Sequence, residues 1–264
     1  MLSIAHLSDP HLDGQQVTHD RLTLVADYLK KLPIQPDLLV VSGDITQPHP
    51  GVAMSDEFAW IDAALRWGPP VLYCPGNSDE QAAFRGLLDE RGDRWADAGG
   101  QAHQVRSVDG VTFLLIDSTV PGEFYGRLQP DSLDWIRATL AGLDAGARAI
   151  LVMHQPPALL GHPIIDQLRL LDGEELEDIV AESPAVIATL CGHTHSGSAT
   201  TFGVKPLLVA PGIHSSGQLP LAYAEPNSGL IDESSPPALA IHLVDDRRLT
   251  TYFEVLAHPA AGDG

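Results

Sequence analysis

Short apolar runs alternate with helix-like segments along residues 1–192, and this alternation constrains the fold more than any other feature. The runs are LSIAHLS, DLLVVSG, PVLYCPG, VTFLLIDS, RAILVMH and AVIATLCG. Apolar residues recur at helical spacing in the segments between them, which are residues 19–31, 55–67, 79–91, 131–140 and 173–182. The rhythm predicts an α/β fold. Asp79 and Asp131 are expected to cap or begin their helices, since a carboxylate there meets unpaired N–H groups.

From residue 199 onward the helical signal fades and short strands dominate, among them LLVA, PALAIHL and LTTYFEV. We expect these strands to form a second sheet that closes the fold. With 264 residues, 44% of them hydrophobic, the chain is long enough for one substantial core and too short for two catalytic domains. The sequence therefore predicts one catalytic domain over residues 1–257 and a flexible C-terminal tail over residues 258–264.

The charge balance restricts the partners of the protein. The formal net charge is −20, and no cluster of Lys and Arg occurs. Proteins that bind long nucleic acids normally present a basic face that displaces counterions from the phosphates, so this class of partner is excluded. A small phosphorylated substrate remains compatible with an acidic chain if a local cation overrides the overall field. Bound metal ions would supply that cation.

The sequence predicts neither a targeting signal nor a chemical role for the cysteines. The N-terminal MLSIAHLSDPH has no basic region followed by an apolar stretch, and no run of about 18 apolar residues occurs. We expect a soluble, cytoplasmic protein that does not enter a membrane. Cys74 and Cys191 lie far apart and each ends an apolar run. They are expected to be buried, reduced packing residues.

Polar residues with metal-binding side chains follow five of the apolar runs. They are Asp9, His11, Asp44, Asn77, His154, His193 and His195. Ligand sites in α/β proteins gather in the loops beyond the carboxyl ends of the strands. A set of carboxylate, amide and imidazole donors suits Mn, Fe, Zn or Co better than Ca or Mg. The sequence therefore predicts a metal centre at these loops.

The spacing within the motifs supports convergence on such a centre. One residue separates Asp9 from His11 and His193 from His195, so both side chains of each pair point the same way in an extended segment. The glycines before Asp44, Asn77 and His193 permit tight turns near the ions. Each motif alone is as typical of a turn or a cap, but five in succession favour metal binding. Two ions about 3.5–4 Å apart would polarise a phosphoryl oxygen and generate a hydroxide nucleophile.

These motifs resemble those of the calcineurin-like metallophosphoesterases, whose pattern is D-x-H, G-D, G-N-H-[DE], H and G-H-x-H. The segments IDSTVPGEFYGRLQPDSLDWIRATL and APGIHSSGQLP, followed by PALAIHL, are similar to class III cyclic nucleotide phosphodiesterases and related glycerophosphodiesterases. The resemblance covers roughly residues 1–257. It implies a pair of mixed β-sheets packed as a sandwich and flanked by helices, in four layers. It also implies a homo-oligomer, a dimer or a larger assembly.

The resemblance further assigns a role to each candidate residue. Asp9, His11 and His195 would bind one divalent ion, and Asn77, His154 and His193 would bind the other. Asp44 would bridge the two ions. For these ions, Mn and Fe are the first candidates from the donor set, with Zn or Co as alternatives. Asn77, Ser78 and Asp44 are the candidate catalytic residues.

One position departs from the family pattern. The G-N-H-[DE] motif reads Gly76-Asn77-Ser78-Asp79, so a serine stands where the family places a histidine that protonates the leaving oxygen or steadies the phosphate. A hydroxyl donates hydrogen bonds but does not titrate near neutral pH. Three explanations are open: another group donates the proton, the substrate has a good leaving group, or the enzyme is slow. His49, His162 and His214 are candidate donors.

The sequence thus predicts a hydrolase of small phosphodiesters, with a 3′,5′-cyclic nucleotide such as cyclic AMP or cyclic GMP as the first candidate and a glycerophosphodiester as the second. A phosphomonoesterase or nucleotide pyrophosphatase is an alternative on the same site. A metal-binding module without activity is another, supported only by Ser78. Residues 157–171 are expected to form a lid over the substrate, with His162, Asp166 and Gln167 as candidate contacts.

Overall fold

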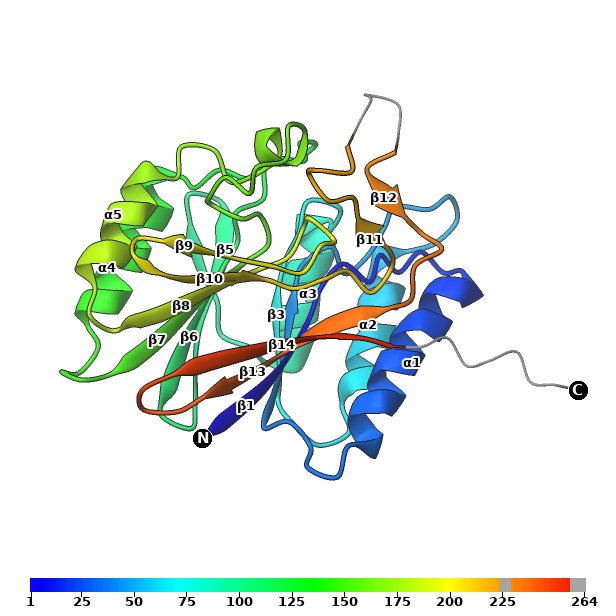
Figure 1. Cartoon of the computed structure of the whole chain (residues 1–264), viewed down its shortest axis with the longest axis horizontal. Helices are drawn as coiled ribbons and strands as arrows, with labels where there is room; N and C mark the ends of the chain where they lie inside the picture. The colour runs from blue at the N-terminus through cyan, green and yellow to red at the C-terminus, as the bar shows by residue number, and fades with distance from the viewer. Residues whose placement is uncertain (224–228, 257–264) are drawn as a thin grey trace, which may run out of the picture.

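Two mixed β-sheets pack face to face, and helices cover the outer face of each sheet (Figure 1). A computed structural model of the chain describes residues 1–223 and 229–256. The four layers confirm the predicted fold class. The predicted tail at residues 258–264 lies outside the described residues.

The first sheet combines parallel N-terminal strands with an antiparallel C-terminal hairpin. Its order is β14 (Leu249–Val255), β13 (Ala238–Val244), β1 (Leu2–Leu7), β2 (Leu38–Ser42) and β3 (Val71–Cys74). Strands β1, β2 and β3 are parallel, and β13 pairs antiparallel with both β1 and β14. Its outer face is covered by α1 (Gln16–Lys31), α2 (Met54–Leu65) and α3 (Gln81–Arg91).

The second sheet has seven strands around a parallel centre. Its order is β4 (Ala96–Ala98), β5 (Gln101–Val108), β6 (Val111–Ile116), β7 (Arg148–Met153), β8 (Val186–Cys191), β10 (Lys205–Val209) and β9 (Ser198–Phe202). Helices α4 (Pro130–Ala141) and α5 (Glu174–Glu182) cover its outer face. Strands β11 (Ser216–Gly217) and β12 (Ile231–Asp232) form a separate two-stranded ribbon.

The central strands, such as β2, β6 and β7, are apolar almost throughout because they are buried on both faces. Ile4 and Val40 pack against Phe113 and Val152 between the two sheets. Residues at alternating positions, such as Ala5 in β1, face the helices instead. Three apolar clusters therefore separate the four layers. Both cysteines are buried and free, which confirms the prediction of packing residues.

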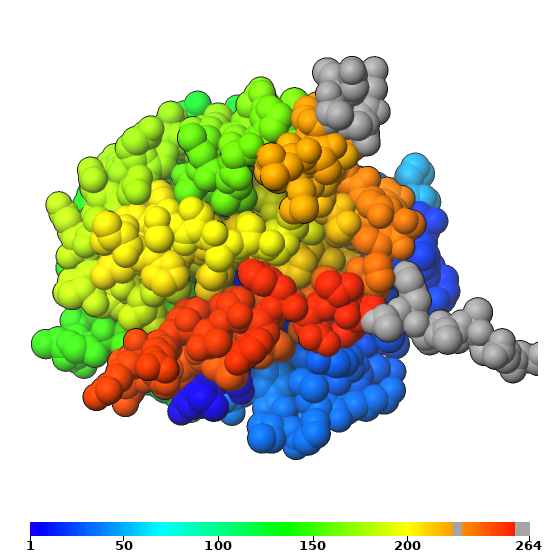
Figure 2. Space-filling view, in the orientation of Figure 1, coloured from blue at the N-terminus to red at the C-terminus, as the bar shows by residue number. Residues whose placement is uncertain are grey.

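Two sequence expectations at the element level were wrong. The C-terminal strands do not form a sheet of their own: β9 and β10 extend the second sheet, whereas β13 and β14 join the first. Figure 2 shows β9 and β10 in yellow beside β14 in red, and Gly197 lies close to the ring of Phe253. Asp79 does not cap α3, because Glu80 is the N-cap and Asp79 is buried. Asp131 does lie in the first turn of α4.

A buried pair of histidines joins β1 to β13 beneath the loops. His6 Nδ1 lies 3.1 Å from His242 Nε2, and His6 Nε2 lies 2.8 Å from Ser42 Oγ. Both rings are fully buried. Burial lowers the pKa of His242 to about 3, and burial together with His242 lowers the pKa of His6 well below its ordinary value. Both histidines are therefore neutral in the folded protein at neutral pH.

This pair is expected to make the fold sensitive to acid. A histidine whose folded pKa is below its unfolded value stabilises the fold above about pH 6.5 and loses that contribution as the pH falls toward the folded pKa, by up to about 1.4 kcal/mol per pH unit. In metal-free protein, we expect the free energy of unfolding to fall less steeply between about pH 7 and 5 in His242→Asn than in the wild type. Urea unfolding at several pH values measures this slope. The exposed His49→Asn is the control; equal slopes in all three proteins would refute the prediction.

Candidate metal centre

The seven candidate ligands occupy loops at the carboxyl ends of strands from both sheets. Asp9 and His11 follow β1, Asp44 follows β2, and Asn77 follows β3, all in the first sheet. In the second sheet, the candidates that follow β7 and β8 are His154, His193 and His195. The two groups of loops meet where the sheet ends come together.

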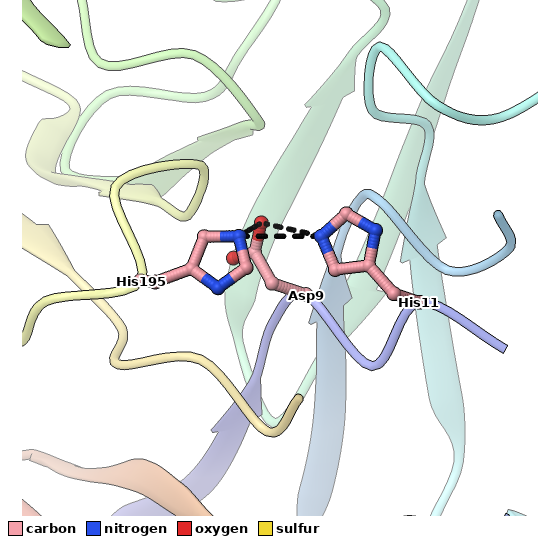
Figure 3. A group of neighbouring side chains, drawn as sticks. All are labelled: Asp9, His11 and His195. Carbon is pink, nitrogen blue, oxygen red and sulfur yellow. Dashed lines mark hydrogen bonds and ion pairs between the residues drawn. The ribbon is translucent and has the colours of Figure 1, made fainter. Parts of the chain in front are cut away.

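The first group contains Asp9, His11 and His195 (Figure 3). His11 Nε2 lies 3.2 Å from His195 Nε2. Asp9 Oδ1 lies 3.4 Å from His195 Nε2 and 3.9 Å from His11 Nε2. These donor atoms all lie within 4.8 Å of one another, a separation that one ion spans.

The second group contains Asp44, His154 and His193. His154 Nε2 lies 3.3 Å from Asp44 Oδ1 and 3.2 Å from His193 Nδ1. The other carboxylate oxygen of Asp44, Oδ2, lies 3.6 Å from His11 Nε2 of the first group. Asp44 is thus the carboxylate between the two groups, with one oxygen directed at each.

Hydrogen bonds outside the centre orient three of the imidazoles. His11 Nδ1 lies 2.9 Å from Gln47 Oε1, and His154 Nδ1 donates to the Ser42 carbonyl at 2.7 Å. His195 Nδ1 lies 2.7 Å from Ser215 Oγ. A neutral imidazole that donates from Nδ1 presents a lone pair at Nε2. When these imidazoles are neutral, their Nε2 lone pairs converge on the centre, as cation binding requires.

Three buried atoms at the centre have no hydrogen-bond partner. They are Asp9 Oδ1, Asn77 Oδ1 and His193 Nε2. A buried acceptor without a partner costs about 1–3 kcal/mol, and such atoms are uncommon in folded proteins. Coordination to metal ions would satisfy the two oxygens, whereas His193 faces the second group with Nδ1 rather than Nε2. The donor set therefore fits two divalent cations with mixed oxygen and nitrogen coordination.

The backbone of the ligand loops is strained, and the expectation that the Asp9–His11 and His193–His195 pairs lie in extended segments was wrong. Eight non-glycine residues in the described part of the chain have positive φ, and five of them are candidate ligands. They are Asp9, His11, Asp44, His193 and His195. Each such conformation costs about 1–3 kcal/mol and persists only where the surroundings enforce it. Side-chain direction at the centre is thus obtained against local backbone preference.

The electrostatics of the second group depend on Asp44. Burial opposes its charge, but the imidazoles of His154, His11 and His193 together outweigh burial and hold the pKa of Asp44 well below its usual range. Burial likewise opposes protonation of His154, whose pKa the Asp44 carboxylate raises to about 9. Burial, with His154 as the next cause, lowers the pKa of His193 to about 4. Without metal, Asp44 and His154 therefore form an ion pair.

Asp79 ties the Asp44 loop to the Asn77 loop. Its carboxylate accepts hydrogen bonds from the backbone N–H groups of Ile45 at 3.1 Å, Thr46 at 2.8 Å and Gly76 at 2.8 Å. The Thr46 hydroxyl donates a fourth, at 3.0 Å. Burial and the nearby Asp44 raise the pKa of Asp79 to about 6. The final acidic residue of the Gly76–Asp79 motif is thus a brace between two ligand loops.

Glycine is required where these loops approach each other. A Cβ atom at Gly76 would collide with Asp44 N and Oδ1, and one at Gly192 would collide with Ser8 Oγ. Gly43 has a φ of +96°. These three glycines thus permit a close approach of the loop backbones.

The hydrogen bonds of Ser78 are not those of a proton donor to substrate. Its backbone N–H donates to Asp44 Oδ1 at 2.8 Å, and its hydroxyl donates to the Thr46 carbonyl at 2.6 Å. The only proton of the hydroxyl is therefore already engaged. Of the candidate substitutes, His214 lies beside the first group, with its ring centre 5.5 Å from that of His11 and its Nδ1 buried without a partner.

A pocket of about 960 Å³ opens above the centre. The predicted lid contributes Ile165 and Leu168 to its lining, but the three lid residues expected to contact substrate are elsewhere. Asp166 accepts from the N–H groups of Leu160 and Gly161, and Gln167 donates to Pro163. The ring of His162 is buried, and its Nδ1 accepts from Ile164 and Ile165. Polar side chains in a tight loop can bond to the backbone of that loop instead of facing the pocket, and this was not predicted from the sequence.

Solved structures share this architecture. A dimetal phosphatase from Danio rerio superposes with a TM-score of 0.64 at 12% identity, covering 96% of each chain. A purple acid phosphatase from yellow lupin also gives 0.64 at 12% identity, covering 96% of this chain and 51% of that one. At this identity the comparison establishes the fold alone. The fold is therefore one that metal-dependent phosphatases use.

Sequence comparisons identify the family. The calcineurin-like phosphoesterase model matches residues 2–197. A probable cyclic nucleotide phosphodiesterase from Rhodococcus erythropolis is 32% identical over 78% of this chain and 69% of its own length. A glycerophosphodiester phosphodiesterase from Enterobacter lignolyticus is 29% identical over 97% of this chain and 92% of its own length. A 3′,5′-cyclic adenosine monophosphate phosphodiesterase from Escherichia coli is 30% identical, covering 79% and 74%.

The chain belongs to the calcineurin-like phosphoesterase family. Members of this family hydrolyse phosphoesters, so the prediction of a phosphoester hydrolase is confirmed. Across residues 1–223 and 229–256, no helix has the length and apolar character needed to cross a bilayer.

Proposed function

We propose that the protein is a dinuclear metal phosphodiesterase that cleaves a small phosphodiester, with a 3′,5′-cyclic nucleotide as the first candidate substrate. The observation that carries this proposal is the position of Asp44, with one carboxylate oxygen 3.6 Å from His11 and the other 3.3 Å from His154. Two ligand groups that share a carboxylate are the arrangement of a two-metal site.

In this proposal, each residue near the centre has a defined task. Asp9, His11 and His195 would hold the first ion, and Asn77, His154 and His193 would hold the second. Asp44 would contribute to both. When bound, the ions polarise a phosphoryl oxygen and lower the pKa of a water molecule. Gln47, Ser215 and the Ser42 carbonyl fix the imidazole orientations. Mn and Fe are the first candidates, and Zn or Co the alternatives.

The pocket lining favours a diester over a monoester. A monoester carries more negative charge and gains from additional cationic side chains. Among the described residues that line the pocket, none is Lys or Arg. The metal ions would therefore be the main positive charge available to the substrate. One negative charge, as on a diester, is the better match.

The relatives supply two candidate substrates within the diester class. Those named as cyclic nucleotide phosphodiesterases support a nucleoside 3′,5′-cyclic monophosphate. The glycerophosphodiester phosphodiesterase, which matches 97% of the chain, supports a glycerophosphodiester. We place the cyclic nucleotide first because more of the similar proteins carry that name.

The proposal is tested by metal removal and replacement. Protein stripped with a chelator is expected to lose hydrolysis of cyclic AMP, cyclic GMP, glycerophosphodiesters and aryl diesters, and to regain it on addition of Mn²⁺. Aryl and alkyl monoesters serve as the comparison. Faster turnover of monoesters than of diesters would favour the phosphomonoesterase alternative. Bound metal without cleavage of any ester would favour the binding module.

Restoring the family histidine at position 78 is expected to increase turnover. Loss of a general acid typically costs about 10²–10⁴ in rate, so Ser78→His should raise kcat on a diester with an alkyl leaving group if no other acid exists. An aryl diester needs no protonation of its leaving group and should respond much less. The ratio of the two kcat changes is the measurement, with metal content determined for each protein.

His214 provides the complementary variant. If His214 donates to the leaving oxygen, His214→Ala lowers turnover of the alkyl diester more than that of the aryl diester, and Ser78→His compensates. The buried His162, which bonds within its own loop, is the comparison histidine. A rate unchanged in Ser78→His and in His214→Ala would contradict both explanations for the missing acid.

A further inference from the structure

The walls of the pocket above the centre are apolar and partly open to solvent. Val120, Pro121 and Phe124, from the segment after β6, form one wall together with Ile165 and Leu168. Leu230 and Ile231 contribute to the lining from the ribbon. Phe124 is 65% exposed and Ile231 is 46% exposed. A ligand that covers these side chains would remove apolar surface from water, which is favourable.

The wall beside Phe124 is held in place. The Gly126 N–H donates to the Arg169 carbonyl at 3.1 Å, and the Leu171 N–H donates to the Gly126 carbonyl at 2.8 Å. This bridge joins the segment that carries Phe124 to the segment that carries Ile165 and Leu168. The apolar surface is therefore a preformed part of the pocket, as ligand sites usually are.

The remaining charge of the lining is negative. Apart from the candidate ligands and the buried Asp79, the charged residues among the described lining are Glu80 and Glu123. Glu80 is the N-cap of α3, and Glu123 lies in the turn before Phe124. Both carboxylate side chains are exposed. The metal ions would balance the reacting phosphate, but no lining side chain would balance a second anion.

We propose that the pocket selects phosphodiesters whose organic group has an apolar face and is uncharged or cationic, and that Glu80 and Glu123 are specificity-determining residues that reject a second anion. This inference rests on the proposed phosphodiesterase function. A neutral nucleobase fits the class, and so does an ammonium head group. A carboxylate or second phosphate within about 8 Å of the two glutamates would meet repulsion that physiological salt screens only in part.

The test compares substrates that differ by one carboxylate. Cyclic AMP is paired with its 2′-O-succinyl ester, and glycerophosphoethanolamine with glycerophosphoserine. With Mn²⁺-loaded protein, kcat/KM is expected to favour the member without the carboxylate by about tenfold. Glu80→Gln and Glu123→Gln are each expected to reduce this ratio about threefold, and the double variant more. Raising the salt concentration from about 0.05 to about 0.5 M should reduce the wild-type ratio and change that of the double variant less.

The matched control is Glu90→Gln, which removes the same charge near the other end of α3. It is expected to leave the ratio unchanged. A wild-type ratio near one, or a ratio that neither glutamate variant nor salt alters, would overturn the inference. If no phosphodiester is cleaved, the proposed function fails instead. Calorimetric binding of the same pairs then decides the inference, because the affinity ratio should follow the same order.

Discussion

Replacing Asp44 by asparagine is expected to lower kcat/KM for a phosphodiester about 10³-fold, because a neutral amide no longer shares its charge between two cations. That loss corresponds to about 4 kcal/mol of transition-state stabilisation. Asparagine keeps an oxygen that can accept the hydrogen bond from Ser78 N–H, so the loop is expected to remain folded. Steady-state kinetics with added Mn²⁺ measures the effect, and metal analysis is expected to find less than two ions per chain.

The control for this variant is Asp178→Asn, which makes the same change at an exposed position of α5. It should retain wild-type kinetics and metal content. If Asp44→Asn kept two bound ions and activity within about tenfold of the wild type, Asp44 would not be the bridging ligand.

Asp79→Ala is expected to lower both stability and metal affinity. The substitution leaves three backbone N–H groups and the Thr46 hydroxyl without their acceptor in a buried site. The cost is about 3–5 kcal/mol, and thermal unfolding of a chain of this size shifts by about 2–4 °C for each kcal/mol. A decrease of about 10 °C in Tm is therefore expected, measured by calorimetry. Release of the two ligand loops should weaken Mn²⁺ binding about 10–100-fold.

Two further variants distinguish loss of the hydrogen bonds that Asp79 accepts from loss of its charge. Asp79→Asn retains one acceptor oxygen but places an NH₂ group against the donors, so its Tm should lie between those of Asp79→Ala and the wild type. Asp178→Ala changes an exposed aspartate of α5 and should unfold at the wild-type temperature. If Asp79→Ala matched the wild type in Tm and in Mn²⁺ affinity, the loops would be held by other contacts.

Much of the fold was predictable because its central strands are buried on both faces. Runs such as DLLVVSG and RAILVMH correspond to β2 and β7, and the helical ranges match α1 to α5 to within a few residues. The hairpin of β4 and β5 was missed, since ADA and QAHQVRSV lack an apolar run. The sheet that each C-terminal strand joins was also mispredicted. A strand that is apolar on one or both faces does not specify its neighbour, which depends on tertiary pairing.

The candidate ligands were predictable from motif and strand position, whereas the residues that orient them were not. Gln47 and Ser215 contact His11 and His195 through turns far apart in sequence. Nothing in the local pattern marks either residue. The pocket lining differs from the predicted substrate contacts for a similar reason. Asp166 and Gln167 bond to backbone groups of their own loop, so Ile165 and Leu168 line the pocket instead. Such choices depend on which polar groups the folded loop leaves unsatisfied.

The division of the ligands between the two sheets has a consequence for the mechanics of the molecule. In the proposed assignment, each ion is bound from both sides: Asp9 and His11 face His195 at one ion, and Asn77 faces His154 and His193 at the other. Each ion would then act as a cross-link between the halves of the sandwich at the end where apolar packing gives way to loops. Metal loading would stiffen this seam, so amide hydrogen exchange in β1, β2, β7 and β8 near the loops should slow when Mn²⁺ is added.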